Sequence, residues 1–200
     1  REMPTGVYDP RWLPCRTHQG TVQALAFTLS RRSEACLPGL ADGQVLDFES
    51  PPIPEVSFFK KADLPGIIVD DTEARLTGFD SEGHTTPGFV ERGYRHDSDK
   101  DKGAQSARFT PELPKAGKYQ VSIAYSALGN RATNVPVTIR HAEGETKVLV
   151  NQKQKPAGGN NFHPLGSFRF EAGKAGWVEI GNEGTKGHVI IDAAQWLPAP

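Results

Sequence analysis

A chain of 200 residues with a formal net charge of −1 has no strong field of either sign, which argues against a nucleic-acid partner. Its 21 glycines and 16 prolines exclude a mainly helical protein and favour a fold of many short strands and turns. No apolar run approaches the ~20 residues that a membrane-spanning helix needs, so we expect no membrane span.

The first segment, residues 1–46, is expected to be an appendage, because its apolar surface is too small for it to fold alone. It contains one predicted strand, at 21–29, and the only two cysteines, Cys15 and Cys36, whose pairing stays open. The segment must dock on the rest of the chain, pair with another chain or stay partly disordered. Because the sequence begins at Arg1 rather than at a methionine, we expect a processed product or a fragment.

Residues 47–65 are predicted to be a linker. The stretch 49–55 reads Glu-Ser-Pro-Pro-Ile-Pro-Glu, and prolines so close together remove backbone donors and keep the chain extended. This linker separates the appendage from a domain at 66–198.

The domain at 66–198 alternates apolar and polar residues between turn signals, which is the pattern of half-buried strands. The predicted strands, in chain order, are 67–69, 74–79, 88–94, 104–109, 118–125, 134–141, 146–150, 165–170, 177–180 and 188–197. A turn at 142–145 joins two of them into a hairpin. The last strand is apolar on both faces and should be central, whereas Pro136 should lie on an edge strand or at a bulge. We therefore predict an all-β fold, an antiparallel β-sandwich of jelly-roll type with a short N-terminal appendage and a prolyl linker.

Several stretches of this domain resemble the golvesin C-terminal-like domain, a β-sandwich found at the ends of secreted bacterial proteins. They begin with Leu64-Pro-Gly-Ile-Ile-Val-Asp-Asp71, continue at 93–97, 116–121 and 130–137, and close with 187–192 and Trp196. Proteins that carry this domain include xanthan lyases and FAD-dependent oxidoreductases. The resemblance implies an extracellular or cell-surface accessory domain with no established catalytic residues.

Residues 1–46 are similar to an internal part of the ChaC-type γ-glutamylcyclotransferases, over the stretches 1–8, 10–12 and 24–32. The resemblance implies that Glu2 would be the acid/base carboxylate of a cyclotransferase. The Tyr-Gly-Ser-Leu loop of that family, which holds the γ-glutamyl group, is absent from the sequence, as is the closing part of the fold. A general base without its substrate-binding groups has nothing to act on, so we expect no enzyme activity.

Eight polar residues beside the predicted strands are candidates for a ligand-binding site. They are Tyr94, His96, Asp97, Asn130, Arg131, Asn134, His188 and Asp192. The tyrosine ring offers a stacking face, and the arginine and amides offer directional hydrogen bonds, which suits a sugar or a carboxylate. The alternative is a structural network that fixes the loops, with Arg131 paired to Asp97 or Asp192.

The stretch Asp97-Ser-Asp-Lys-Asp101 suggests a calcium loop, because its carboxylates alternate along the chain. Lys102 and Arg108 stand where an EF-hand loop needs a glycine and a glutamate, which leaves only a looser calcium site. Such a site would use Asp97, Asp99 and Asp101, and would share Asp70 or Asp71. The alternative is a solvated loop whose lysines neutralise its aspartates, without a cofactor.

Three aromatic residues, Trp177, Trp196 and Phe162, could form a sugar-stacking platform, although core packing is the alternative for both tryptophans. Three functions follow from the sequence. The first is a non-catalytic extracellular module that binds polysaccharide or cell-surface matrix. The second is an assembly module whose N-terminal arm contacts another chain, and the third is a γ-glutamylcyclotransferase remnant.

Overall fold

The computed structural model describes residues 17–18, 21–22 and 57–199. The chain divides between Glu55 and Val56 into two units. In the first unit, β1 (Thr17–His18) pairs antiparallel with β2 (Thr21–Val22), which is the start of the strand predicted at 21–29. The other predictions for this unit fall outside the described residues; they concern Glu2, Cys15, Cys36, the arm at 1–46 and the linker at 47–56.

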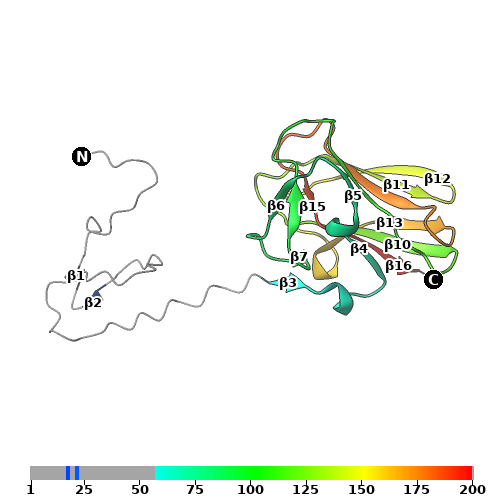
Figure 1. The fold of residues 1–200 in the computed structure, drawn as a ribbon, viewed down its shortest axis with the longest axis horizontal. Helices are drawn as coiled ribbons and strands as arrows, with labels where there is room; N and C mark the ends of the chain where they lie inside the picture. The colour runs from blue at the N-terminus through cyan, green and yellow to red at the C-terminus, as the bar shows by residue number, and fades with distance from the viewer. Residues whose placement is uncertain (1–16, 19–20, 23–56, 200) are drawn as a thin grey trace. The chain divides into compact units, whose positions relative to one another are not determined.

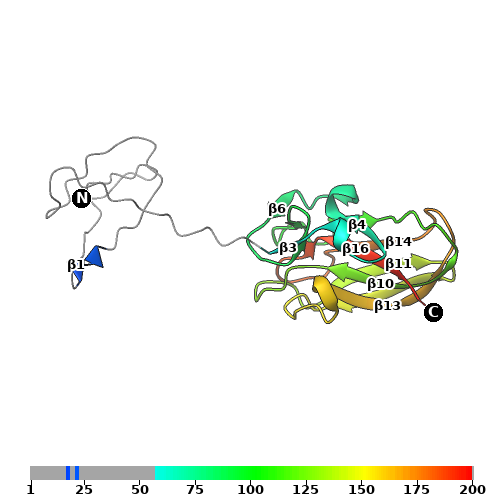
Figure 2. The ribbon, with the colours of Figure 1, turned by 90° about the horizontal axis from the view of Figure 1, so that it is seen from below.

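The second unit is an antiparallel β-sandwich, as predicted, and its two larger sheets lie one over the other (Figures 1 and 2). The four-stranded sheet has the order β13-β10-β16-β4, with bounds Phe162–Phe170, Gly117–Ala124, Ala193–Pro198 and Ile67–Asp70. The five-stranded sheet has the order β12-β11-β14-β9-β5, with bounds Gly144–Val150, Val135–His141, Trp177–Gly181, Ser106–Phe109 and Arg75–Thr77.

Two smaller sheets lie at the end of the sandwich opposite the β11–β12 hairpin (Figure 1). One has the order β15-β8-β6, with bounds Ile190–Ile191, Tyr94–His96 and Ser81–Gly83. The other pairs β3 with β7 in parallel, with bounds Phe58–Phe59 and Phe89–Val90. Single turns of 3-10 helix are η2 (Lys61–Asp63), η3 (Asp71–Glu73) and η4 (Gly159–Asn161). A search of the described residues finds no helix long and apolar enough to cross a membrane.

The core lies between the two large sheets because alternate residues of each strand point inward. On β11, Val135, Val137 and Ile139 are fully buried, in agreement with their period-2 pattern. On β16, Trp196 is fully buried, and this strand lies between β10 and β4. The central position predicted from the two apolar faces of this strand is therefore confirmed.

Two predicted strands are each divided in the structure. The strand predicted at 88–94 becomes β7 and β8, because Glu91 adopts a left-handed φ of 55° that breaks the extended backbone. The strand predicted at 188–197 becomes β15 and β16, with Asp192 between them.

The prediction that Pro136 lies on an edge strand or at a bulge is wrong. Pro136 belongs to β11, an inner strand between β12 and β14, and faces Leu149 in an unbroken register. It comes one residue before the first β11–β14 pair, Val137 with Ile180. Proline has no backbone N–H to donate, and Pro136 lies just outside the β11–β14 ladder, where that strand pair does not need the donor.

The predicted linker ends earlier than the sequence suggests. Residues 57–65 contain β3 and η2, and Leu64 is buried in an apolar cluster with Ile68 and Val90. Leu64 and the partly buried Phe59 give this stretch apolar side chains that packing against the sandwich removes from water, which favours a folded segment over an extended linker.

Candidate functional site

Asp97 is the centre of a hydrogen-bond network that joins loops far apart in the sequence. Its buried carboxylate accepts hydrogen bonds from Lys102 Nζ at 2.6 Å, Asn182 Nδ2 at 3.1 Å, and the backbone N–H groups of Val189 at 2.9 Å and Asp99 at 3.0 Å. Burial alone would raise the pKa of Asp97, but these donors hold it below its ordinary value. Asp97 therefore fixes the loops, as the structural alternative proposed, and has no free lone pair directed at a ligand.

The ammonium group of Lys102 lies among the oxygens that the calcium hypothesis assigned to a metal ion. It also contacts Asp99 Oδ1 at 3.0 Å and the carbonyl oxygen of Gly187 at 2.8 Å. The structure shows no side-chain contact from Asp101 to this group, and none of the described residues form a group of three or more His, Cys, Asp or Glu able to hold a metal. Lys102 thus supplies the positive charge, in agreement with the alternative in which lysines neutralise the aspartates.

Arg131 does not pair with Asp97 or Asp192, and that prediction is wrong. Its Nε donates to the carbonyl oxygen of Ser126 at 3.1 Å, and its Nη1 donates to Asn130 Oδ1 at 3.0 Å. The guanidinium also lies 5.7 Å from the centre of the Tyr94 ring, within cation–π range. The buried arginine is satisfied by these local groups, while Asp97 has already been neutralised by Lys102.

His96 and His188 meet beside this arginine. Their rings are 5.5 Å apart in an edge-to-face arrangement, and His96 Nδ1 accepts from the backbone N–H of Ser98 at 3.2 Å. Burial, together with His188 and Arg131, lowers the pKa of His96, so its imidazole is neutral at neutral pH. The backbone N–H of His188 donates to the carbonyl oxygen of Asn130 at 3.0 Å, which ties two loops together.

Two of the eight predicted residues lie apart from this group. Asn134 Nδ2 donates to the carbonyl oxygen of Gly184 at 2.9 Å and so joins two other turns. Asp192 is fully buried and accepts from the backbone N–H of Val90 at 3.1 and 3.2 Å. Its neighbouring charges are Asp70 and Asp71, not the histidines, because it lies where β15 gives way to β16. The prediction that Asn134 and Asp192 share one site with the other six residues is wrong.

A polar pocket of about 340 Å³ opens beside His96, and we call it the end-loop pocket. It is lined by Gly78, Asp80, Ser81, His96, Asp97, Ser98, Lys100, Asp101, Ala104 and Gln105. The hydroxyl oxygens of Ser81 and Ser98 are 2.7 Å apart. The side chains of Asp80, Lys100 and Asp101 are exposed and make no hydrogen bond to any described residue. Groups that donate and groups that accept hydrogen bonds therefore remain available here.

The backbone around the end-loop pocket is unusual. Phe79, Ser98, Asp99 and Asp101 all have φ between 48° and 57°, a conformation that costs of order 1 kcal/mol or more for a residue with a side chain. Gln105 supports two of these turns: its Oε1 accepts from the Phe79 N–H at 2.7 Å and its Nε2 donates to the Lys100 carbonyl at 3.1 Å. The sequence analysis did not identify five residues of this pocket: Asp80, Ser81, Ser98, Lys100 and Gln105. No local sequence pattern predicts which residues adopt the left-handed conformation or which distant residues they contact.

The predicted aromatic platform does not exist. Trp196 and Phe162 are buried between or beside the sheets. Trp177 is partly exposed, but the guanidinium of Arg108 lies 4.0 Å from the centre of its ring. The alternation that places Trp196 on an inward face also makes it core.

Comparison with known proteins identifies a domain family. The family model of the Golvesin C-terminal domain matches residues 67–196. The xanthan lyase of Bacillus sp. (strain GL1) is 35% identical over 141 residues, which are 68% of this chain and 15% of that protein. The solved structure of Paenibacillus xanthan lyase matches with a TM-score of 0.63 and 34% identity, over 67% of this chain and 13% of that chain.

A further solved structure, the Podospora anserina GH26-CBM35 β-(1,4)-mannanase, gives a TM-score of 0.49 and 20% identity over 68% of this chain and 28% of that chain. At these values the likeness carries no information about a ligand. The present chain spans only a small part of each of these enzymes. Because the family model matches the folded unit from the first residue of β4 to Trp196 of β16, the chain belongs to the Golvesin C-terminal domain family.

Proposed function

We propose that this chain is a non-catalytic accessory module that binds polysaccharide outside the cell through the end-loop pocket. The observation that carries the proposal is the set of available polar groups in that pocket, namely the exposed side chains of Asp80, Lys100 and Asp101. Sugar hydroxyls donate and accept hydrogen bonds equally well, so a site with both kinds of group suits them.

The frame of the pocket is prepared for binding before a ligand arrives. Asp97, Lys102 and Gln105 hold the loops through buried or partly buried hydrogen bonds. A ligand therefore does not have to order these loops, and less of the binding free energy is lost to conformational entropy.

The similarity to xanthan lyases supports polysaccharide as the ligand class and xanthan as the first polymer to test. A module of this kind would hold an enzyme near its polymer and raise the effective concentration of substrate. Its own binding can then be weak.

Affinity gel electrophoresis in the presence of xanthan tests the proposal. We expect xanthan to retard the wild-type chain, and Asp80→Ala or Lys100→Ala to weaken binding by about tenfold, the effect of one hydrogen bond to a charged group. Lys174→Ala is the matched control, because Lys174 makes only an exposed ion pair with Glu112 at 3.4 Å. The proposal would be overturned if neither xanthan nor another polysaccharide retarded the wild-type chain. It would also be overturned if Asp80→Ala, Lys100→Ala and Lys174→Ala all lost the same affinity for xanthan.

The two other functions predicted for the N-terminal segment remain predictions, since they rest on residues outside the described ones. Light scattering with and without residues 1–50 tests the assembly role, which fails if both forms are monomers. Release of 5-oxoproline from glutathione tests the cyclotransferase role of Glu2, and we expect none.

A further inference from the structure

Phe58 presents an aromatic ring to solvent next to a second pocket. Its side chain is 48% exposed, and it is the only aromatic residue among the large exposed hydrophobic residues of the described chain; the others are Leu128 and Leu149. The ring stacks on Phe89 with a centroid distance of 6.2 Å and an interplanar angle of 12°. One face of the Phe58 ring is therefore supported by protein.

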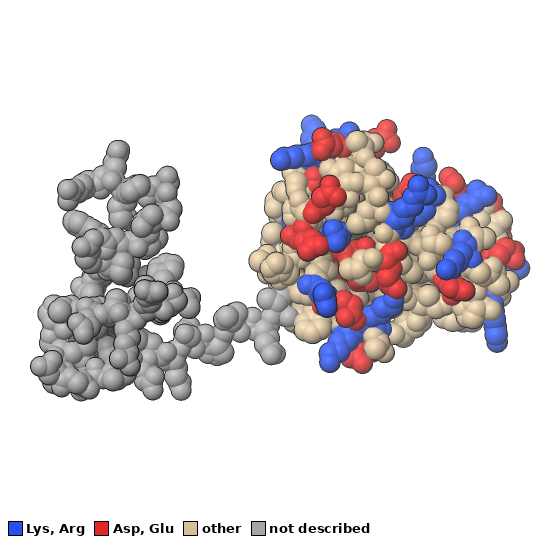
Figure 3. All heavy atoms as spheres, viewed as in Figure 1, with Lys and Arg blue, Asp and Glu red and all other residues tan. Residues whose placement is uncertain are grey.

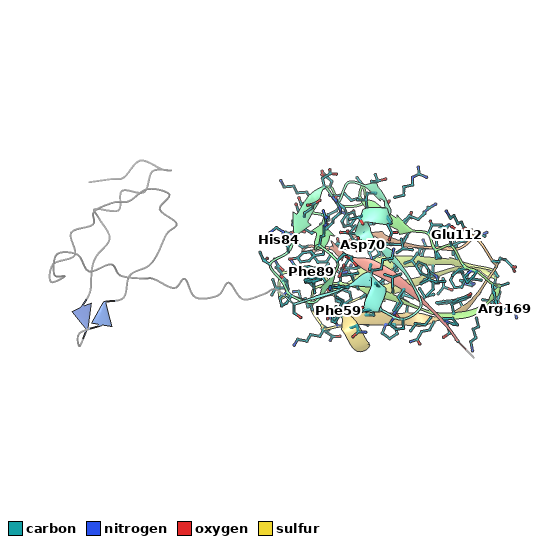
Figure 4. The ribbon with its side chains drawn as sticks, turned by 60° about the horizontal axis from the view of Figure 1, so that its bottom comes forward. Phe59, Asp70, His84, Phe89, Glu112 and Arg169 are labelled. Carbon is teal, nitrogen blue, oxygen red and sulfur yellow. The ribbon has the colours of Figure 1, made fainter. Side chains whose placement is uncertain are left out.

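The support beneath Phe58 is packed and hydrogen-bonded to the sandwich. Phe89 is buried and also contacts the ring of Tyr94, with centroids 6.4 Å apart. The short β3–β7 ladder is extended by two backbone hydrogen bonds, from the N–H of Gly88 to Ser57 at 2.6 Å and from that of Glu91 to Phe59 at 2.8 Å. Figure 4 shows Phe59 and Phe89 at the same end of the sandwich.

The pocket beside Phe58 has an aromatic side and a polar side. Its volume is about 280 Å³, near the lower limit of about 300 Å³ for small-molecule sites, which suits a single ring rather than a large ligand. It is lined by Phe58, Phe59, Lys60, Asp63, Leu64 and Asn160. Lys60 and Asp63 balance each other in charge, so the pocket does not require an ionic ligand.

The polar residues of this pocket are free to bind. Neither Lys60, Asp63 nor Asn160 makes a side-chain hydrogen bond to a described residue, whereas their neighbours do the anchoring. The backbone N–H of Lys61 donates to Glu91 Oε1 at 2.6 Å, and Asn161 Nδ2 donates to the carbonyl oxygen of Gly88 at 2.6 Å.

Asn160 is held in an unfavourable backbone conformation at the rim of the pocket. Its φ is 52°, and that of Asn161 is 65°, so two consecutive residues with side chains are left-handed. Such strain persists only where surrounding structure imposes it, and it often marks binding sites. Here the left-handed backbone places Asn160 in the lining of the pocket, where its side-chain amide makes no hydrogen bond to a described residue.

We propose that Phe58, Lys60, Asp63 and Asn160 form a second sugar-binding subsite, which takes the apolar face of one pyranose ring on Phe58 and its hydroxyl groups on the polar residues. This inference rests on the proposed function of polysaccharide binding. Three of these residues precede residue 67, where the family match begins, so the subsite is built partly by a segment outside the matched domain.

Titration of the full-length chain with xanthan in affinity gels tests the subsite. Phe58→Ala should weaken binding at least about fivefold, because the stacking face is lost. Phe58→Trp should bind as tightly as the wild type or more tightly, since indole offers a larger face. Leu149→Ala is the matched control for loss of an exposed apolar side chain, and its affinity should not change.

Asn160→Gly gives an independent readout that does not endanger the fold. Glycine adopts the left-handed conformation readily, so the melting temperature should stay equal or rise, while loss of the amide should weaken binding about threefold. Unchanged affinity in both Phe58→Ala and Asn160→Gly, with the wild type still bound by xanthan, would overturn the subsite and leave the end-loop pocket intact. If the wild type binds no polysaccharide, the proposed function and the subsite both fall.

Discussion

The ammonium group of Lys102 contacts Asp97 at 2.6 Å, Asp99 at 3.0 Å and the carbonyl oxygen of Gly187 at 2.8 Å. The Asp97 side chain is fully buried, whereas that of Lys102 is 25% exposed. A buried carboxylate that loses its counter-charge keeps the cost of leaving water without the attraction that offset it. At the scale of single residues, removal of Lys102 alone should therefore destabilise the fold strongly.

Lys102→Met should lower the free energy of unfolding by about 3 kcal/mol at pH 7, because it removes the charge and keeps most of the aliphatic stem. Urea unfolding followed by circular dichroism measures the change. Lys174→Met, which breaks only the exposed pair with Glu112, should cost less than about 1 kcal/mol. Equal losses in the two variants would contradict a special role for Lys102.

Asp70, Asp71 and Asp192 form a second group of acidic side chains, and all three are buried. Burial, with the added repulsion of Asp70, raises the pKa of Asp71 to about 7, although Arg95 lies 3.8 Å away and opposes the shift. Burial, with repulsion from Asp71 and Asp70, raises the pKa of Asp192 well above its ordinary value.

The direction of the pH effect follows from these raised pKa values. Below about pH 3, under the ordinary Asp pKa, these carboxyls are largely protonated in both folded and unfolded chains, so their ionisation adds no free-energy cost to folding. As the pH rises toward 7, the unfolded chain loses its protons first, and the folded state is progressively disfavoured.

Asp71→Asn should therefore stabilise the fold at pH 8 by about 1–3 kcal/mol and have little effect at pH 4. Urea midpoints at the two pH values measure this difference. Glu112→Gln is a control at an exposed carboxylate, and it should change the urea midpoint little at either pH 4 or pH 8. The same gain at pH 4 and pH 8 would show that charge on Asp71 is not the cause.

At the scale of elements, the strands differ in how much the local sequence specifies them. The β11–β12 hairpin follows directly from alternation and a turn: His141 pairs with Gly144, and Val135, Val137 and Ile139 face the core. No local sequence pattern predicts the left-handed conformation of Glu91, which divides β7 from β8. The local sequence likewise does not predict that Pro136 lies in an inner strand, because this depends on where the β11–β14 ladder ends.

The ends of the strands are where the candidate site forms, and there the sequence was informative only in part. It pointed to His96 and Asp97, which line the end-loop pocket, and to Tyr94, Arg131 and His188, which gather beside His96. It could not assign their partners, because the backbone donor from Val189 reaches Asp97 from 92 residues away. Which buried polar groups satisfy each other depends on the packing of loops, which local patterns do not encode.

At the scale of the whole molecule, acidic and basic side chains are interspersed over the face seen in Figure 3, in keeping with the net charge of −1. Recognition of a polymer must then come from short-range contacts rather than from a long-range field. Among the described residues, the buried apolar side chains run from Leu64 to Trp196 and form two packed clusters.

A fragment of residues 57–200 should therefore unfold in one cooperative transition, with a midpoint within a few degrees of that of the sandwich in the full chain. Thermal unfolding followed by near-ultraviolet circular dichroism, which reports on the buried Trp196, measures this. A fragment that lacks a cooperative transition would show that residues 1–56 complete the fold. A further fragment, 66–200, should be less stable because it loses Leu64 and β3.

Apolar alternation, turn residues and family motifs were enough to establish an all-β sandwich, its hairpin, its central last strand and its family, because strand periodicity is a local property of the chain. The tertiary structure was needed to place Lys102 where calcium was considered and to separate Asp192 from the histidines. It was also needed to reveal the two pockets. These features depend on which distant loops meet and which charges are removed from water together, and only the folded chain brings those groups within reach of one another.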